Sequence, residues 1–118
     1  MATKKLTDLE AQIMSLIWTR PNGVRVRDVY EGLNPIRKQN RQKELAYTTY
    51  MTVMTRLAEK QVLRQVRGEG RAYIYKPKLM LEIAREEAVT GLAKTYFAGS
   101  LPELGTWVNQ YLDLKGGV

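Results

Sequence analysis

Residues 47–60, YTTYMTVMTRLAEK, carry the pattern that decides the fold. At about 100° per residue, a helix built from this segment has one apolar face, which consists of Tyr50, Val53, Met54, Leu57 and Ala58. The opposite face is polar and consists of Thr48, Thr49, Thr52, Thr55, Arg56 and Glu59. The segment therefore predicts an amphipathic helix whose apolar face packs against a core.

The polar face of this helix is unusual for a surface that meets only solvent. Threonine is a poorer helix former than alanine by up to about 0.7 kcal/mol, and Glu, Lys or Gln are commoner on solvated helix surfaces. Threonine hydroxyls can bond phosphates or base edges, threonine methyls can touch thymine, and arginine can bond guanine O6 and N7. The face therefore fits the major groove of DNA, and a solvated face with accidental threonines is the alternative interpretation.

Two β-prone runs follow this helix, at residues 62–67 and 71–76. They are joined by Gly68-Glu69-Gly70, and runs joined by a short glycine-containing loop predict a β-hairpin. Arginines surround its tip, and we expect them to contact DNA: Arg64 and Arg67 at phosphates, and Arg71 on the wing. The alternative interpretation is that these charges only protect a solvent-exposed sheet edge against aggregation.

The segments before residue 47 complete a recognisable order of elements. Residues 7–10, TDLE, form a capping-box motif that opens a helix, and this helix should end before Pro21. Residues 24–26 suggest a very short strand, and residues 27–33 suggest a second helix that Pro35 stops. Helix, short strand, helix, helix and hairpin is the order of a winged helix-turn-helix, whose third helix enters the major groove.

A basic stretch occupies the expected connection between the second and third helices, with Arg37, Lys38, Arg41 and Lys43. One interpretation is a mobile, solvated loop. The alternative is supplementary, sequence-independent contact with DNA phosphates, for which Arg41 and Lys43 are the candidates.

Charge divides the 118-residue chain near Pro77. Residues 1–78 hold 16 Lys and Arg against 7 Asp and Glu, a net charge of +9, whereas residues 79–118 hold 3 against 5, a net charge of −2. We therefore expect a winged-helix DNA-binding domain over residues 1–78 and a helical dimerisation region over residues 79–118. The predicted fold class is mainly α with a small β-hairpin.

The last forty residues predict two amphipathic helices. Residues 81–98 form the first, and Ser100-Leu101-Pro102-Glu103 is a start signal for the second. Two such helices cannot cover their own apolar faces, so they pack on a partner or on the rest of the chain, and a symmetric partner is the commonest solution. The expected dimerisation residues are Leu92, Tyr96, Phe97, Leu104, Trp107, Val108, Tyr111 and Leu112.

The composition argues against several classes of function. The chain has no cysteine and no histidine, which removes disulfides, thiolate metal sites and the commonest general base. Neither serine has the context of a nucleophile, and no glycine-rich phosphate loop occurs. No apolar run reaches the roughly 20 residues that span a bilayer. We therefore expect a cytoplasmic protein that is no enzyme and that uses no cofactor, metal or membrane.

Several motifs resemble one known family. Residues 45–57, LAYTTYMTVMTRL, followed by Glu59-Lys60, resemble the recognition-helix signature of the BlaI/MecI penicillinase-repressor family. Residues 6–10 with Ile17-Trp18 are similar to the family's opening, and residues 23–29, 70–75 and 97–100 are similar to later parts of it. The resemblance covers most of residues 5–112.

The resemblance implies a homodimeric repressor that binds a palindromic operator in double-stranded DNA. In this family the N-terminal winged helix binds DNA and the C-terminal helices dimerise. Carried over to this chain, the DNA-binding residues are Tyr47, Thr48, Thr49, Met51, Thr52, Arg56 and Arg71. The alternative is a winged helix that serves as a module for protein, RNA or non-specific nucleic-acid binding.

The resemblance also bears on regulation. Some members are cleaved in their C-terminal part when a membrane sensor is triggered, so an inducing protease or sensor is a further expected partner. Residues 107–109, WVN, do not reproduce the Asn-Phe cleavage site of the staphylococcal members. Copper-responsive relatives carry C-terminal cysteines, which this chain lacks.

Overall fold

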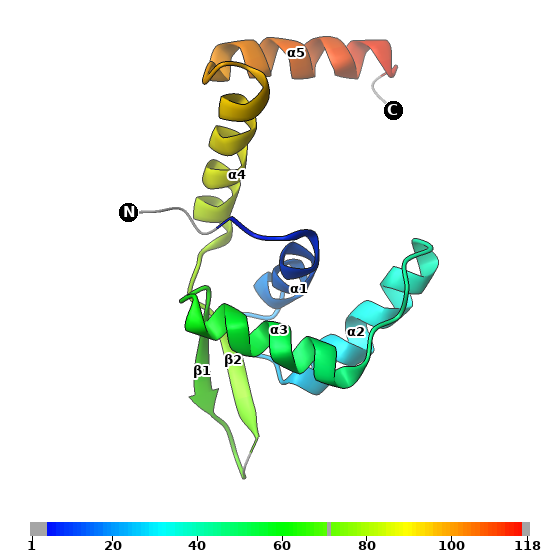
Figure 1. Ribbon diagram of the computed structural model, residues 1–118, viewed down its shortest axis with the longest axis vertical. Helices are drawn as coiled ribbons and strands as arrows, with labels where there is room; N and C mark the ends of the chain where they lie inside the picture. Colours follow the sequence, from blue (N-terminus) through cyan, green and yellow to red (C-terminus); the bar gives the residue numbers. More distant parts are fainter. Residues whose placement is uncertain (1–4, 71, 117–118) are drawn as a thin grey trace. The chain divides into compact units, whose positions relative to one another are not determined.

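Five helices and one two-stranded sheet make up the part of the chain that the computed structural model describes, residues 5–70 and 72–116 (Figure 1). The chain divides into two compact units, Met1–Leu81 and Glu82–Val118. The order of elements is α1 (Asp8–Trp18), α2 (Val26–Gln39), α3 (Tyr47–Glu59), β1 (Leu63–Arg67), β2 (Tyr73–Pro77), α4 (Leu81–Tyr96) and α5 (Leu101–Leu114). This order confirms the mainly helical winged helix-turn-helix with C-terminal helices.

The predicted capping box opens α1. The Thr7 hydroxyl accepts from the Glu10 N–H at 3.2 Å, and the Glu10 carboxylate accepts from the Thr7 N–H at 2.9 Å. Both interactions satisfy amides that the first turn of a helix leaves without partners. At the other end, the Trp18 indole N–H donates to the carbonyl of Leu79 at 2.9 Å, which ties α1 to the chain segment that follows β2.

The second helix corrects a sequence prediction, because α2 runs through Pro35 and ends only at Gln39. Proline removes one N–H and crowds the preceding turn, so it normally ends a helix. Here tertiary hydrogen bonds beyond Pro35 offset that cost. The Arg37 guanidinium donates to Gln12 Oε1 at 2.8 Å and to the carbonyl of Lys43 at 2.7 Å, which holds the last turns of α2 in place.

The strand expected at residues 24–26 is shorter than predicted. Val24 forms an isolated antiparallel bridge with Tyr75, with N···O distances of 3.0 and 2.7 Å. Arg25 then caps α2 by donating its N–H to Asp28 at 2.8 Å, and Val26 is already helical. The early start of α2 thus limits the strand to one residue.

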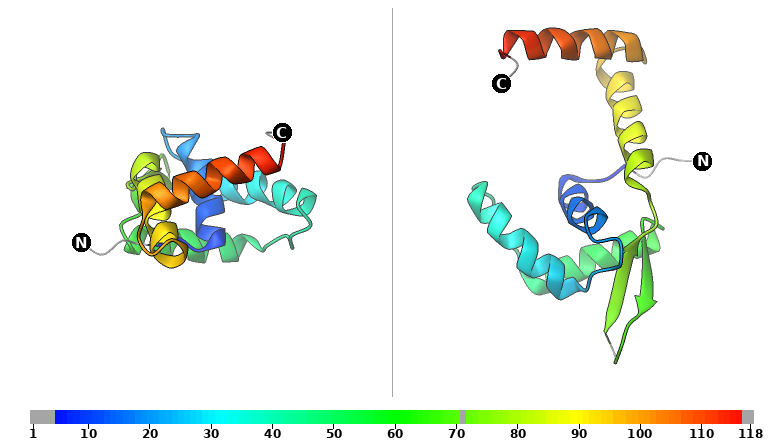
Figure 2. Two further views of the ribbon diagram at one scale, coloured as in Figure 1. Left: turned by 90° about the horizontal axis from the view of Figure 1, so that it is seen from above. Right: turned by 180° about the vertical axis from the view of Figure 1, so that it is seen from behind.

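The predicted hairpin is present. Its strands β1 and β2 pair antiparallel, with Leu63 opposite Pro77 and Arg67 opposite Tyr73. In Figure 1 and in the right-hand view of Figure 2 the hairpin projects beyond the helices of its unit. The hairpin therefore forms the wing of the fold, and its base joins the core through buried Leu63 and Tyr75.

One continuous core holds α1, α2, α3 and the wing together. The core comprises Ile13, Met14, Ile17, Val24, Val26, Val29, Leu33, Tyr50, Val53, Met54, Leu57, Val62, Leu63 and Tyr75. Four of the five residues predicted for the apolar face of α3 are buried, and the fifth, Ala58, is partly buried against the same core. Burial of apolar surface stabilises a fold by about 25 cal/mol per Å², so these side chains fix the position of α3.

Gly23 is needed where the chain passes the wing. Its φ of +111° lies in the region that favours glycine, and a Cβ atom there would collide with Ile74 Cγ2. The collision arises because the next residue, Val24, pairs with β2. A glycine is thus required for the closest approach between the α1–α2 connection and the wing.

The second unit contains α4 and α5. α4 ends at Tyr96, two residues earlier than the sequence suggests, because Ala98 and Gly99 adopt positive φ values of 49° and 83°. Ser100 caps α5, as predicted, by accepting from the Glu103 N–H at 3.2 Å. Ala93 and Leu104 are buried, which gives this unit a small apolar contact of its own.

Among the described helices, none combines the length and the apolar character that crossing a membrane requires.

Candidate nucleic-acid interface

The exposed face of α3 carries most of the residues that the sequence singled out. Thr48, Thr52 and Arg56 are exposed, Met51 is 41% exposed, and Thr49 is partly buried at the margin. Among the described residues, these side chains make no hydrogen bond or ion pair that would occupy them. The structure therefore presents hydroxyl, methyl, thioether and guanidinium groups together on one solvent-facing surface, which we call the α3 face.

Two further residues of α3 share this face. Thr55 and Glu59 are exposed, and their spacing places them in line with Thr48 and Thr52. Glu59 puts a negative charge at the C-terminal end of the α3 face. Arg56 places a positive charge in the same last turn, so both signs of charge occur at this end of the helix.

Aromatic rings surround the start of α3. Tyr47, its first residue, is 42% exposed and meets the ring of Tyr30 edge-to-face at a centroid distance of 5.7 Å. Tyr30 also meets Tyr50 edge-to-face at 6.1 Å. Such pairs add about 0.5–1.5 kcal/mol beyond their buried area. Tyr47 is thus held beside the α3 face rather than free to rotate.

The wing supplies the second group of predicted residues. Arg64 and Arg67 are exposed on β1, and the Arg67 guanidinium lies 6.0 Å from the ring centroid of Tyr73. A cation–π contact of this kind restricts the side chain while leaving its charge available. Arg71, predicted at the tip, lies outside the described residues.

The basic stretch is divided between α2 and the connection after it, which corrects the sequence assignment. Arg37 and Lys38 belong to the last turn of α2, whereas Arg41 and Lys43 lie in the connection and are exposed. Arg37 is engaged with Gln12 and Lys43, so it has a structural role. In Figures 1 and 2 the far end of α2 and this connection lie away from the tip of the wing.

Sequence reasoning missed Asn34, which lies in the second half of α2. Its side chain is buried and bonds to the backbone of Leu45 twice, accepting from the N–H at 3.0 Å and donating to the carbonyl at 2.9 Å. The Tyr50 hydroxyl also donates to Asn34 Oδ1 at 2.6 Å. The sequence predicted that the helix stops at the neighbouring Pro35, and no sequence motif indicated the three hydrogen bonds of Asn34.

An ion pair ties the other end of α3 to α1. The Lys60 ammonium lies 2.8 Å from Glu10 Oε2, and Glu10 is only 3% exposed. Burial by itself raises the pKa of Glu10, but hydrogen bonds from Lys60 and from the Thr7 N–H outweigh that effect and hold the pKa below its ordinary value of 4.5. The carboxylate is therefore charged at neutral pH and fixes the C-terminal end of α3.

Two further groups have shifted pKa values. The backbone hydrogen bond from Arg25 is the largest cause that lowers the pKa of Asp28 below 3.8. Burial raises the pKa of Tyr50 above 10.0. Tyr50 is therefore a neutral donor to Asn34 over the whole physiological range.

Six of the eight residues expected to dimerise are exposed apolar side chains on the second unit. Tyr96 is 74% exposed, and Leu92, Trp107, Val108, Tyr111 and Leu112 are also exposed. Phe97 is partly buried, and Leu104 is buried within the chain at 7% exposure. Leu104 is thus not available at the surface of this chain.

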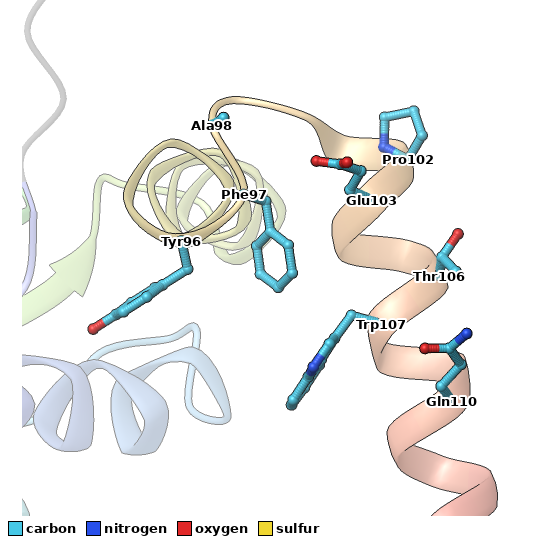
Figure 3. Close-up of a pocket in the computed structure, with 8 residues that line it drawn as sticks. All are labelled: Tyr96, Phe97, Ala98, Pro102, Glu103, Thr106, Trp107 and Gln110. Atoms are coloured by element: carbon cyan, nitrogen blue, oxygen red, sulfur yellow. The ribbon is translucent and has the colours of Figure 1, made fainter.

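Aromatic residues line an open hollow between the end of α4 and the start of α5 (Figure 3). Phe97 and Trp107 face each other across it at a centroid distance of 6.2 Å, and Trp107 stacks on Tyr111 at 5.1 Å. Large apolar patches on a soluble protein mark interaction sites. Within the described residues, no group of three or more acidic, histidine or cysteine side chains is placed to hold a metal ion.

Comparison with known proteins agrees with this architecture. Residues 6–115 match the family model described as "Penicillinase repressor". The proteins named "Transcriptional regulator BlaI" from two strains of Mycobacterium tuberculosis, CDC 1551 / Oshkosh and ATCC 25618 / H37Rv, are each 40% identical to this chain over 88 residues. The match covers 75% of this chain and 56% of each relative, so the chain spans about half the length of these relatives. The family match over nearly the whole chain shows that this protein belongs to the penicillinase repressor family.

Proposed function

We propose that this chain is a transcriptional repressor that binds a palindromic operator in double-stranded DNA as a homodimer and blocks transcription in the cytoplasm. The α3 face is the observation that carries the proposal. Among the described residues, its polar side chains make no hydrogen bond or ion pair, and α3 is followed directly by a wing that exposes Arg64 and Arg67. Membership of the penicillinase repressor family supports it.

The α3 face supplies groups that read base edges. Arg56 can donate two hydrogen bonds to guanine, while Thr48, Thr52 and Met51 can touch thymine methyl groups or accept and donate single hydrogen bonds. Each good bidentate contact is worth about 1–3 kcal/mol of discrimination. Sequence preference therefore depends on α3 and is expected to be strongest at the base pair that faces Arg56.

Phosphate contacts set affinity and orientation rather than preference. Arg64 and Arg67 project from the wing, and the excess of cations over residues 1–78 adds a long-range attraction for DNA. Arg41 and Lys43 follow the C-terminal end of α2, and this end of the helix lies away from the tip of the wing, so we expect them to reach phosphates only at the margin of the site. Non-specific affinity is therefore expected to depend more on the wing than on the α2–α3 connection.

The second unit supplies the means of pairing two copies. Its exposed aromatic and aliphatic side chains on α4 and α5 form a surface that water disfavours and that a second copy would cover. Two linked winged helices on half-sites about 10 base pairs apart, or a multiple of that, bind far more tightly than one. Cleavage or displacement of α4 and α5 by an inducing protease or sensor would then release the DNA.

A gel-shift titration tests the proposal. The probes are promoter duplexes from the chain's own operon and its neighbours, titrated against unrelated duplex DNA at two salt concentrations. We expect one promoter to contain a protected palindrome that is bound at least about a thousandfold more tightly than the competitor. Equal, salt-labile binding to every duplex would contradict the proposal and favour a non-specific nucleic-acid or protein-binding module.

A further inference from the structure

We propose that Asn34 is a positioning residue for operator recognition, because its side chain sets the place at which α3 begins. This inference rests on the proposed DNA-binding function. Asn34 lies on α2, and among the described residues its side chain makes no hydrogen bond to a side chain of the α3 face. Its three hydrogen bonds all go to the segment that enters α3 or to the first turn of that helix.

The start of α3 lacks the usual local control. Its N-cap residue is Ala46, which has no side chain to cap the free amides of the first turn. Instead, Asn34 pairs with both the N–H and the carbonyl of Leu45, at 3.0 and 2.9 Å, in the way that a neighbouring strand would. The residue just before the helix is thereby fixed to α2 at two points.

A third bond extends the control into α3 itself. Tyr50 lies one turn into the helix, and its hydroxyl donates to Asn34 Oδ1 at 2.6 Å. Tyr30 lies one turn before Asn34 on α2, and its ring meets both Tyr47 and Tyr50 edge-to-face. The contacts of Asn34 and Tyr30, which lie on one side of α2, thus fix the first turn of α3 both along its helix axis and in its rotation about that axis.

Directional bonds add to the apolar packing here. Buried Val53, Met54 and Leu57 hold α3 against the core, and hydrogen bonds, which weaken steeply with misalignment, add a constraint on the position of its first turn. Asn34 also precedes Pro35, a position that disfavours helical backbone, and remains within α2. Its buried bonds offset that local cost and place Thr48 and Thr52 relative to the wing.

The test compares specific with non-specific binding by variants of the 118-residue chain. Asn34→Ala removes all three bonds, Tyr50→Phe removes one, and Ile13→Val is the control because it deletes buried carbon from α1 without touching the network. The dissociation constant of each protein is measured for the protected promoter duplex and for an unrelated duplex of equal length, at one salt concentration. Circular dichroism measures the folded fraction of each variant.

A positioning role changes the ratio of the two constants. We expect the preference for the promoter duplex to fall about tenfold in Asn34→Ala, equivalent to losing one base contact, and by a smaller factor in Tyr50→Phe. Ile13→Val should keep the wild-type ratio. A purely stabilising role would lower both affinities by the same factor, because only the folded fraction would change, and an unchanged ratio in both network variants would overturn the inference.

Two further readouts keep the outcomes distinct. If Asn34→Ala fails to fold, Tyr50→Phe decides, since it keeps its ring in the core and retains both bonds to Leu45. Hydrogen exchange of the Leu45 amide should accelerate in Asn34→Ala and stay slow in Ile13→Val. A wild-type protein that shows no preference for any promoter duplex would contradict the proposed function itself, whereas preference retained in both network variants contradicts only the role of Asn34.

Discussion

Single side chains on α3 separate into those that hold the helix and those that face outward. Tyr50, Met54 and Leu57 are buried, while Thr48 and Arg56 are exposed and make no contact that occupies their polar groups among the described residues. The sequence pattern predicted this separation, because a helix repeats every 3.6 residues and its buried face must be apolar. Roles in DNA recognition remain predictions, which substitution can test.

Arg56→Ala is expected to relax specificity at one base pair of the operator. The variant loses the only guanidinium of α3, so binding should weaken by about 1–3 kcal/mol, and that base pair should become tolerant of exchange. Binding to a set of operator duplexes with single base-pair changes measures this. Arg27→Ala, which removes an exposed guanidinium of α2 outside the α3 face, is the control. An unaltered base preference in Arg56→Ala would rule out a role for Arg56 in base reading.

The buried Glu10 carboxylate should make the stability of the fold depend on acid pH. Its pKa is lower in the folded chain than its ordinary value of 4.5, so its contribution to stability is present above that value and is lost as pH falls through the folded pKa. Urea unfolding at a series of pH values from about 3 to 7 should show this loss. Glu10→Gln should reduce the pH dependence, leaving the part due to Asp28, whose pKa is also lowered. An identical pH profile in the variant would contradict this account.

At the scale of elements, the sequence predicted the helix caps and the hairpin correctly. It did not predict the features that depend on contacts between residues distant in the sequence. The capping box at Thr7, the cap at Ser100 and the glycine-linked hairpin follow from residues a few positions apart, and all are present. α2 passed unexpectedly through Pro35 because Arg37 bonds to Gln12, which lies 25 positions earlier. Asn34 was missed for the same reason, since its partner Leu45 lies 11 positions away.

Gly23→Ala should loosen the wing from the core. The new Cβ would collide with Ile74 at a φ of +111°, so we expect destabilisation of about 1–3 kcal/mol by urea unfolding. Gly70→Ala is the matched control, because its φ of +71° is also positive but nothing lies within 4 Å of the added atom. A larger loss of unfolding free energy in Gly23→Ala than in Gly70→Ala would be due to the collision with Ile74. Equal losses in both variants would show that backbone strain alone accounts for the effect.

The wing and the connection after α2 should differ in their dependence on salt. Arg67→Ala removes an exposed wing cation and should lower the slope of log affinity against log salt by about one for unrelated duplex DNA. Arg41→Ala, in the connection, should change the slope less. Fluorescence anisotropy at several salt concentrations measures both. A larger change in Arg41→Ala would place the DNA backbone on α2 instead of the wing.

At the scale of the whole molecule, the two compact units differ in charge and in surface chemistry. The cations concentrate in residues 1–78, whereas residues 79–118 have a net charge of −2 and expose apolar side chains on α4 and α5. Such a distribution suits a protein in which one part meets a polyanion and the other meets a second copy. The charge difference can be counted from the sequence, whereas the burial of Leu104 could not be predicted from its place in the apolar pattern of α5.

Leu112→Lys should weaken dimerisation and, through it, operator binding. Leu112 is 50% exposed on the apolar side of α5, and a charge there would be desolvated in a dimer. Sedimentation should show a dimer dissociation constant raised at least about tenfold, and affinity for the full palindrome should fall while affinity for a half-site is unchanged. Asn109→Lys, on the polar side of α5, is the control. An unchanged dimer dissociation constant in Leu112→Lys would contradict a role for Leu112 and would favour α4 as the dimer interface.

The unoccupied polar groups of the α3 face have a consequence for how such proteins diversify. Among the described residues, no hydrogen bond or ion pair joins Thr48, Thr52 or Arg56 to the scaffold, so the scaffold does not constrain their identity. Under the proposed function, new target sequences would therefore be acquired by exchanging a few outward side chains at little cost in folding free energy. Gene duplication followed by such exchanges would give a family of switches that share one frame and address different promoters.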